Sequence, residues 1–128
     1  MFRASCIRSR GFKLAITSEI IGKLGGRVEV IPVEAVNSGG RGDTILHTVH
    51  VPDGESWLIA AIGDMSPSGT SASLAPDLAI GDIKTNRYNT QNRMTVAGVH
   101  TGTVDVKMVK NSPSGTDSFT GHVYTVKL

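Results

Sequence analysis

Cysteine is nearly absent from this sequence, since Cys6 is the only one. A single cysteine cannot form a disulfide within the chain, and it excludes the zinc sites that several cysteines build. Long apolar runs are also missing. The longest, Trp57 to Ile62, is far shorter than the roughly 20 residues of a membrane-spanning helix. We therefore expect a fold that depends on its core alone, with no membrane among its partners.

Aromatic side chains are scarce as well, at 5% of the residues. Valine, isoleucine and leucine must therefore fill most of the core, and branched side chains pack well on the pleated surface of strands. Apolar residues make up 39% of the chain and charged residues 19%, which is typical of a globular protein. A chain of 128 residues is long enough for one domain that buries about two-thirds of its unfolded surface.

The motifs of common enzyme classes are absent from the sequence. It has no Gly-x-Ser-x-Gly elbow, no Walker-type loop and no Gly-x-Gly-x-x-Gly turn. His47 and His50 are three residues apart on an expected strand, so they point to opposite faces and do not chelate one ion. We predict a protein that is not an enzyme and has no metal ion or cofactor. A calcium site built from Asp64, Asp77 and Asp117 in separate loops remains an alternative without sequence support.

Positive charge is concentrated at the N-terminus. Residues 1–13 contain Arg3, Arg8, Arg10 and Lys13 but no acid, whereas the remainder has nine basic and eleven acidic residues. We predict a flexible basic arm over residues 1–10, followed by a single domain over 11–128. The arm is either a solvated tail or an assembly arm that becomes ordered when subunits pack together. Aromatic residues are not interleaved with its charges, so we do not expect nucleic acid as a partner.

Short segments of alternating or apolar character, separated by turn residues, predict about eight strands. The only helix-like piece begins at Ser18 and ends near Gly25, one or two turns long, and a strand that turns a corner is the alternative for this segment. This pattern indicates an all-β fold, an antiparallel β-sandwich of either jelly-roll or immunoglobulin-like type. The expected strands are Gly11–Ile16, Arg27–Val36, Thr44–Val51, Trp57–Ile62, Leu78–Lys84, Arg93–Val99, Thr103–Lys110 and Phe119–Leu128.

Three of these segments support more specific predictions. Thr44–Val51 alternates, which places Ile45, His47, Val49 and Val51 on one face, and the turn Pro52–Glu55 then predicts a hairpin with Trp57–Ile62. Pro32 cannot donate a ladder hydrogen bond, so its strand should lie at a sheet edge or be bulged there. Gly98 is a candidate bulge in the strand that contains it.

The polar segments between strands are candidate recognition loops. Asp64–Ser73 and Thr85–Asn92 are predicted loops, and Tyr88 in the second is the best candidate for an exposed recognition side chain. The pentapeptide Ser-Pro-Ser-Gly-Thr occurs at Ser66–Thr70 and again at Ser112–Thr116. Recurrent turn chemistry explains the repeat, and the alternative is two similar hairpins that project matching loops at one end of a sandwich.

The segment Thr48–Trp57 has the pattern T-V-x-V-P-x-G-x-x-W. It resembles hairpins of small β-sandwich proteins in virus particles, among them bacteriophage head-decoration, fibre and tail proteins. The resemblance implies a structural subunit of a virion, made in the host cytoplasm, whose partners are copies of itself and other virion proteins. It assembles through its N-terminal arm and its sheet surfaces. The alternative is a carbohydrate- or receptor-binding module that meets host-surface glycans or receptors through its polar loops.

Overall fold

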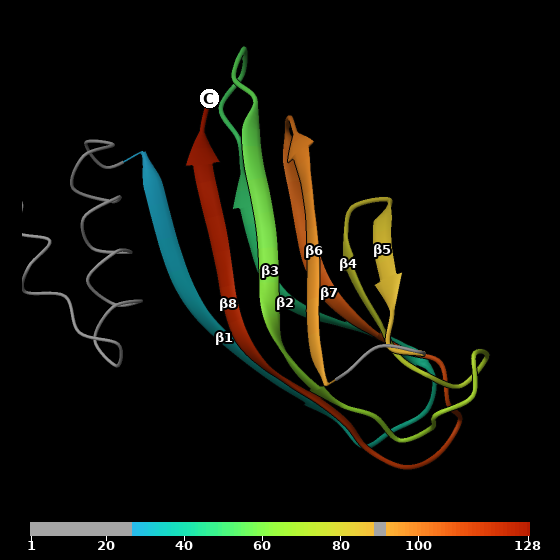
Figure 1. The fold of residues 1–128 in the computed structure, drawn as a ribbon. Coiled ribbons are helices and arrows are strands. Elements are labelled where there is room, and N and C mark those ends of the chain that lie inside the picture. Colours follow the sequence, from blue (N-terminus) through green and yellow to red (C-terminus); the bar gives the residue numbers. More distant parts are fainter. Residues whose placement is uncertain (1–26, 89–91) are drawn as a thin grey trace, which may run out of the picture.

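The computed structural model describes residues 27–88 and 92–128 (Figure 1). Over these residues the chain forms eight strands. The predicted basic arm, the first predicted strand at Gly11–Ile16 and the helix-like piece from Ser18 lie outside the described residues. The strands are β1 (Val28–Asn37), β2 (Gly42–His50), β3 (Trp57–Ser66), β4 (Asp77–Ile80), β5 (Ile83–Asn86), β6 (Arg93–His100), β7 (Thr103–Lys110) and β8 (Asp117–Lys127).

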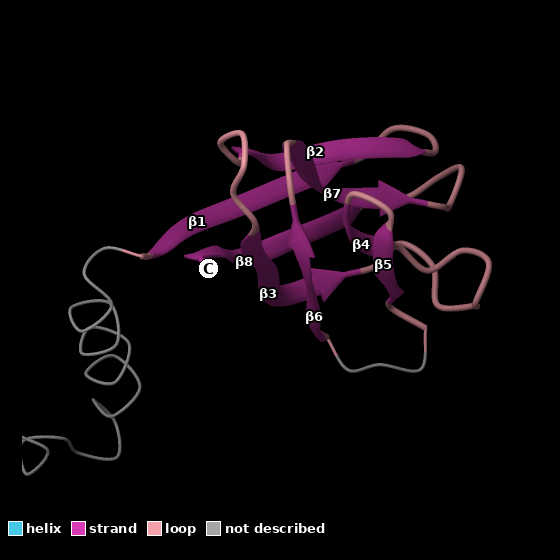
Figure 2. Ribbon diagram, turned by 90° about the horizontal axis from the view of Figure 1, so that it is seen from above, coloured by secondary structure: helices cyan, strands magenta, loops and turns pink. Residues whose placement is uncertain are grey.

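The strands form two antiparallel four-stranded sheets that pack as a sandwich, which confirms the predicted fold class (Figure 2). The strand orders are β1-β8-β3-β6 and β2-β7-β4-β5. The first strand thus pairs with the last, the second with the seventh, the third with the sixth, and the fourth with the fifth. This arrangement is one long hairpin rolled onto itself, the jelly roll, and it excludes the immunoglobulin-like alternative, in which strands pair in a different order.

The predicted hairpin between Thr44–Val51 and Trp57–Ile62 is wrong, because β2 and β3 belong to different sheets. The turn itself forms: the Glu55 amide donates to the Pro52 carbonyl over 3.0 Å, and Gly54 has a φ of +83°. Past the end of β2, however, the Val51 amide donates to the Gly102 carbonyl. The chain therefore leaves one sheet after β2 and enters the other at Trp57, so the same turn chemistry joins two sheets instead of two paired strands.

The single strand predicted over Leu78–Lys84 is in fact two strands. Gly81 has a φ of +57°, which places a tight turn between β4 and β5. Two predicted loops are also shorter than expected, since β3 continues to Ser66 and β5 continues to Asn86. Residues 27–88 and 92–128 form eight strands, the number predicted for the chain, although one predicted strand, Gly11–Ile16, lies outside these residues and another is divided in two.

Pro32 lies on an edge strand, as predicted, because β1 is the outermost strand of its sheet. The predicted bulge at Gly98 is wrong, since β6 pairs with β3 without interruption. The irregularity lies in β2, where the register with β7 shifts between Ile45 and His47. The shift turns Ile45 outward and lets Leu46 pack against the core, so Ile45 does not share a face with Val49.

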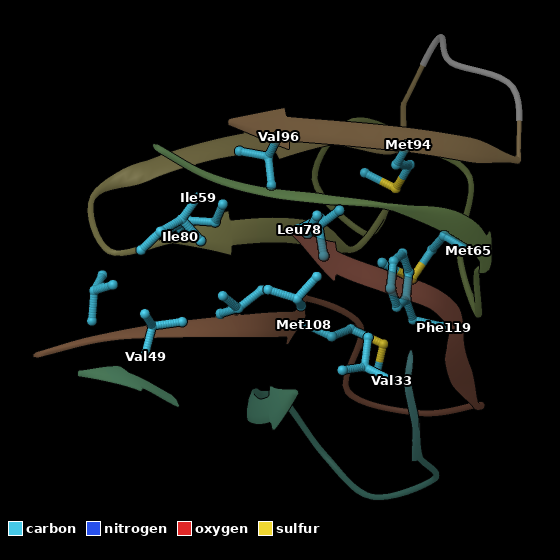
Figure 3. Packing of buried hydrophobic residues seen from close by; sticks show 14 of the residues in the cluster. Val33, Val49, Ile59, Met65, Leu78, Ile80, Met94, Val96, Met108 and Phe119 are labelled. Atoms are coloured by element: carbon cyan, nitrogen blue, oxygen red, sulfur yellow. The ribbon is translucent and has the colours of Figure 1, made fainter. Parts of the chain in front are cut away.

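The core fills the space between the two inner sheet faces (Figure 3). In β7, alternate residues face the core, since Val104, Val106 and Met108 are all buried. Methionine and one phenylalanine supplement the expected branched side chains. The buried cluster consists of Val33, Val49, Val51, Ile59, Ala61, Met65, Leu78, Ile80, Met94, Val96, Val104, Val106, Met108, Phe119 and Val123.

Candidate interaction face

The outer face of the β1-β8-β3-β6 sheet is apolar over most of its length. The strand register aligns Val28, Val126, Leu58 and Val99 in one row across all four strands. The second row, with Val30, Tyr124, Ala60 and Ala97, is apolar except for the tyrosine hydroxyl, whereas the third row contains the polar residues His122 and Thr95 beside Pro32 and Ile62. We call this surface the apolar face; its members are Val28, Val30, Pro32, Leu58, Ala60, Ile62, Ala97, Val99, Tyr124 and Val126.

The side chains of the apolar face remain in contact with solvent. Val99 is 59% exposed, and Pro32 and Ala97 are also exposed, whereas their neighbours on the central strands are half-buried. From the usual spacing of strands and of alternate residues, three rows over four strands cover on the order of 400 Å². The largest apolar patch on a typical soluble monomer is of about this size and is often functional.

The apolar face ends at a polar row. This row contains Glu34, Thr120, Asp64 and Arg93, all of them exposed. Within it, Arg93 Nη1 lies 3.6 Å from Asp64 Oδ1. Between the apolar face and the polar row, a hollow of about 300 Å³ opens beside Pro32, Glu34 and His122. An apolar patch with a charged border on one side is the usual anatomy of a protein–protein contact.

The sequence of β3 gives independent support for a covered outer face. From Trp57 to Ile62 every residue is apolar, although only alternate positions, Ile59 and Ala61, point into the core. Strands that are covered on both faces have such continuous apolar runs, whereas strands with one solvated face alternate. The composition of β3 therefore matches a sheet that is covered on its outer side as well.

The outer face of the other sheet is charged. Lys107 Nζ lies 2.9 Å from Asp43 Oδ2, and Thr48 donates a hydrogen bond of 2.8 Å to Asp105 Oδ1. A hollow of about 340 Å³ on this face is lined in part by Asp82 and Lys84. The two outer faces thus differ in character, and the charged one is compatible with permanent contact with water.

A buried polar network closes the end of the sandwich where the β3–β4, β5–β6 and β7–β8 connections meet. Lys110 is 1% exposed, and its Nζ donates to the carbonyls of Ser112 and Ser114 over 2.6 and 2.9 Å. Asp77 accepts hydrogen bonds from Asn86 and Asn111. These contacts satisfy backbone and side-chain groups within the protein, so we assign the network a structural role.

The two Ser-Pro-Ser-Gly-Thr segments come together at this same end. The Ser68 amide donates to Asp117 Oδ1 over 2.5 Å, and a Cβ atom on Gly115 would lie 2.8 Å from Ser68 Cβ. The two segments therefore lie at one end of the sandwich, as the second interpretation expects, but they do not close two hairpins, because each connects strands of different sheets. The segments follow strands of opposite sheets, β3 and β7, and pack against each other.

The sequence-predicted site residues have different outcomes. Arg3, Arg8, Arg10 and Lys13 lie outside the described residues. Tyr88 is 42% exposed after β5, and its amide donates to Asn86 Oδ1 over 2.9 Å. Trp57 is half-buried at the border of the core, where its Nε1 donates to Glu55 and Lys127 Nζ lies 5.4 Å from its ring centroid.

The three acids considered for calcium are not assembled into a site. Asp64 lies at the border of the apolar face with Arg93, whereas Asp77 and Asp117 are buried in the polar end and bonded to amide groups. Over residues 27–88 and 92–128, no three histidine, cysteine, aspartate or glutamate side chains gather in a way that could hold a metal ion.

The apolar face is the feature that the sequence prediction missed. The sequence contains a signal, since Tyr124, Val126 and Leu128 alternate along the last predicted strand, Phe119–Leu128. The alternation did not tell which side of the strand faces the core, and the structure shows that Phe119, Val123 and Thr125 do. Val28 and Val30 of β1 likewise point outward.

In the described part of the chain, no helix has the length and apolar character needed to cross a membrane. In comparisons with known proteins, the sequence matches no family model and no curated protein.

Proposed function

We propose that this chain is a non-enzymatic structural subunit of a virus particle, a capsid, decoration or tail component, that assembles with copies of itself and with other virion proteins. The observation that carries the proposal is the apolar face, a sheet surface of order 400 Å² that the described residues leave in solvent. Exposure of such a surface is unfavourable for an isolated protein, and association removes it from water. Its place of action is then the virion, after synthesis in the host cytoplasm.

The fold is compatible with a structural role in a virion, but it does not by itself imply that role. Jelly rolls occur in viral capsid proteins, and also in lectins and cupins, so the fold by itself assigns no function. The support comes from the site: one outer face is apolar, while the other is charged. A subunit with one apolar outer face can form defined contacts through that face without aggregating over its whole surface.

The proposal is tested by the solution mass of the full chain, measured by light scattering over a wide concentration range. A defined oligomer whose population grows with concentration supports an assembly subunit. A strict monomer at all concentrations contradicts self-assembly through this face.

A carbohydrate- or receptor-binding module is the second candidate, and the exposure of Tyr88 favours it. An exposed aromatic ring on a polar loop can stack on a sugar or contact a receptor, and jelly rolls include lectins. Its test is the melting temperature in the presence of a panel of host-surface glycans. A ligand-dependent rise in wild type that Tyr88→Ala abolishes supports this function, and no rise with any glycan counts against it.

A further inference from the structure

We propose that the apolar face binds residues 12–24 of a neighbouring copy of this chain. The inference rests on the proposed assembly function and names the partner of its surface. It follows from the size of the face, the place at which the preceding chain joins it, and the distribution of apolar and charged residues in that chain.

The apolar face is too small for two sandwiches to pair through this face alone. Stable interfaces bury about 800 Å² on each partner, roughly twice the area estimated for the apolar rows. A single chain segment fits this area better. Thirteen residues span about 20 Å as a helix and about 40 Å when extended, enough to cross a four-stranded sheet in either form.

The chain before β1 meets the sheet at the correct place. Arg27 immediately precedes Val28, which lies in the most apolar row of the face. Gly25 and Gly26 directly precede it in the sequence, and glycine is the residue type that restricts the direction of a chain least. A segment that leaves at the edge of one sheet in this way can be passed to the same face of an adjacent copy, as in domain swapping.

The composition of residues 12–24 matches the surface. Apolar side chains predominate over its length, at Phe12, Leu14, Ala15, Ile16, Ile20, Ile21 and Leu24. The basic residues Arg8, Arg10 and Lys13 come at and before its start, and Glu19 and Lys23 are the charged residues in the remainder. The apolar face likewise changes to a polar row with the exposed acids Glu34 and Asp64, of which Asp64 lies beside Arg93. The apolar side chains of the segment can therefore meet the apolar face while its basic residues approach the acids of the polar row. Because part of this attraction is electrostatic, binding should weaken as the salt concentration rises.

The experiment places cysteines on the full chain in a Cys6→Ser background. One tagged protein carries Ile20→Cys, and a second, with a tag of different size, carries Val99→Cys; the two are mixed and oxidised. The matched control replaces the second protein by Ile45→Cys, because Ile45 on the opposite outer face is 56% exposed against 59% for Val99. In these mixtures, a disulfide between the two tags forms only between copies.

We expect several-fold more mixed disulfide with Val99→Cys than with Ile45→Cys. Equal yields, or no mixed disulfide, overturn the inference. A double variant, Ile20→Cys with Val99→Cys, that closes only within one chain overturns it as well, because the segment then covers its own sheet. Light scattering on the same samples separates the inference from the proposed function. An oligomer that forms no disulfide between positions 20 and 99 refutes the inference but leaves the assembly function intact. A monomer refutes the assembly function as well.

Discussion

Gly63 lies directly opposite Gly121 where β3 pairs with β8, and neither position has space for a Cβ atom. A Cβ on Gly121 would overlap the Ile62 carbonyl oxygen and lie 2.6 Å from Gly63 Cα. A Cβ on Gly63 would lie 2.6 Å from Phe119 Cζ. The two strands that form the centre of the sheet therefore approach more closely here than any larger residue allows, and both curve strongly along their length (Figure 1).

Alanine at either glycine should destabilise the protein. We expect Gly63→Ala and Gly121→Ala each to lower the free energy of unfolding by about 1–3 kcal/mol, because backbone atoms must move to admit the methyl group. Urea unfolding measures the change. Gly40→Ala is the control, since a Cβ there meets nothing within 4 Å, and its effect should stay within about 0.5 kcal/mol. Equal effects at all three positions would show that the close approach has no energetic consequence.

Lys110 should contribute to stability although it is a buried base. Lys110→Met keeps much of the side-chain volume but leaves the carbonyls of Ser112 and Ser114 without their charged donor. We expect a loss of about 3 kcal/mol in the free energy of unfolding. Lys84→Met, at a side chain that is 67% exposed, should cost less than about 0.5 kcal/mol. A Lys110→Met protein as stable as wild type would rule out a structural role for the ammonium group.

Asp77 should contribute far more than Asp64 to the free energy of unfolding. Asp77 is 6% exposed and accepts from two asparagine amides, so Asp77→Ala should cost about 2 kcal/mol of unfolding free energy. Asp64 has only a solvent-exposed pairing with Arg93, and Asp64→Ala should cost less than about 1 kcal/mol. Thermal unfolding of both variants in parallel provides the comparison. The reverse order would refute the assignment of the polar end as a structural network.

The packing at the polar end of the sandwich should also limit position 115 to glycine. This residue has a φ of +81°, a conformation that L side chains rarely adopt, and a Cβ there would press on Ser68. We expect Gly115→Ala to cost about 1–3 kcal/mol. Gly40→Ala again serves as the control, and the melting temperature is sufficient to rank the two. A neutral Gly115→Ala would mean that the two pentapeptide loops do not depend on this contact.

The spacing of apolar residues and the turn residues made the all-β fold class predictable. These are local signals, however, and they do not show which strands pair. Pro52–Glu55 forms the expected turn, yet it joins β2 to β3 across the sandwich, because sheet membership is decided by strands distant in sequence. The predicted single strand Leu78–Lys84 is two strands for a similar reason. Gly81 at positive φ divides this short apolar run, and periodicity could not separate one strand from two.

The candidate site was less predictable than the fold. Alternation along β8 puts Tyr124 and Val126 on one side of the strand, but the sequence does not show which side faces the core, because both sides have apolar residues. In β8 the core side was decided by Phe119 and Val123, which pack against residues of distant strands. The bulge beside Ile45 had no local signal at all, since neither glycine nor proline marks it.

The most direct test of the account compares two substitutions in the concentration-dependent solution mass of the full chain. Val99→Arg places a charge on the apolar face, and Ile45→Arg places the same charge at an equally exposed site on the opposite outer face. We predict that Val99→Arg shifts the oligomer to monomer while Ile45→Arg assembles like wild type. Assembly that survives Val99→Arg, or that is lost equally in both variants, would contradict the claim that the apolar face joins the subunits.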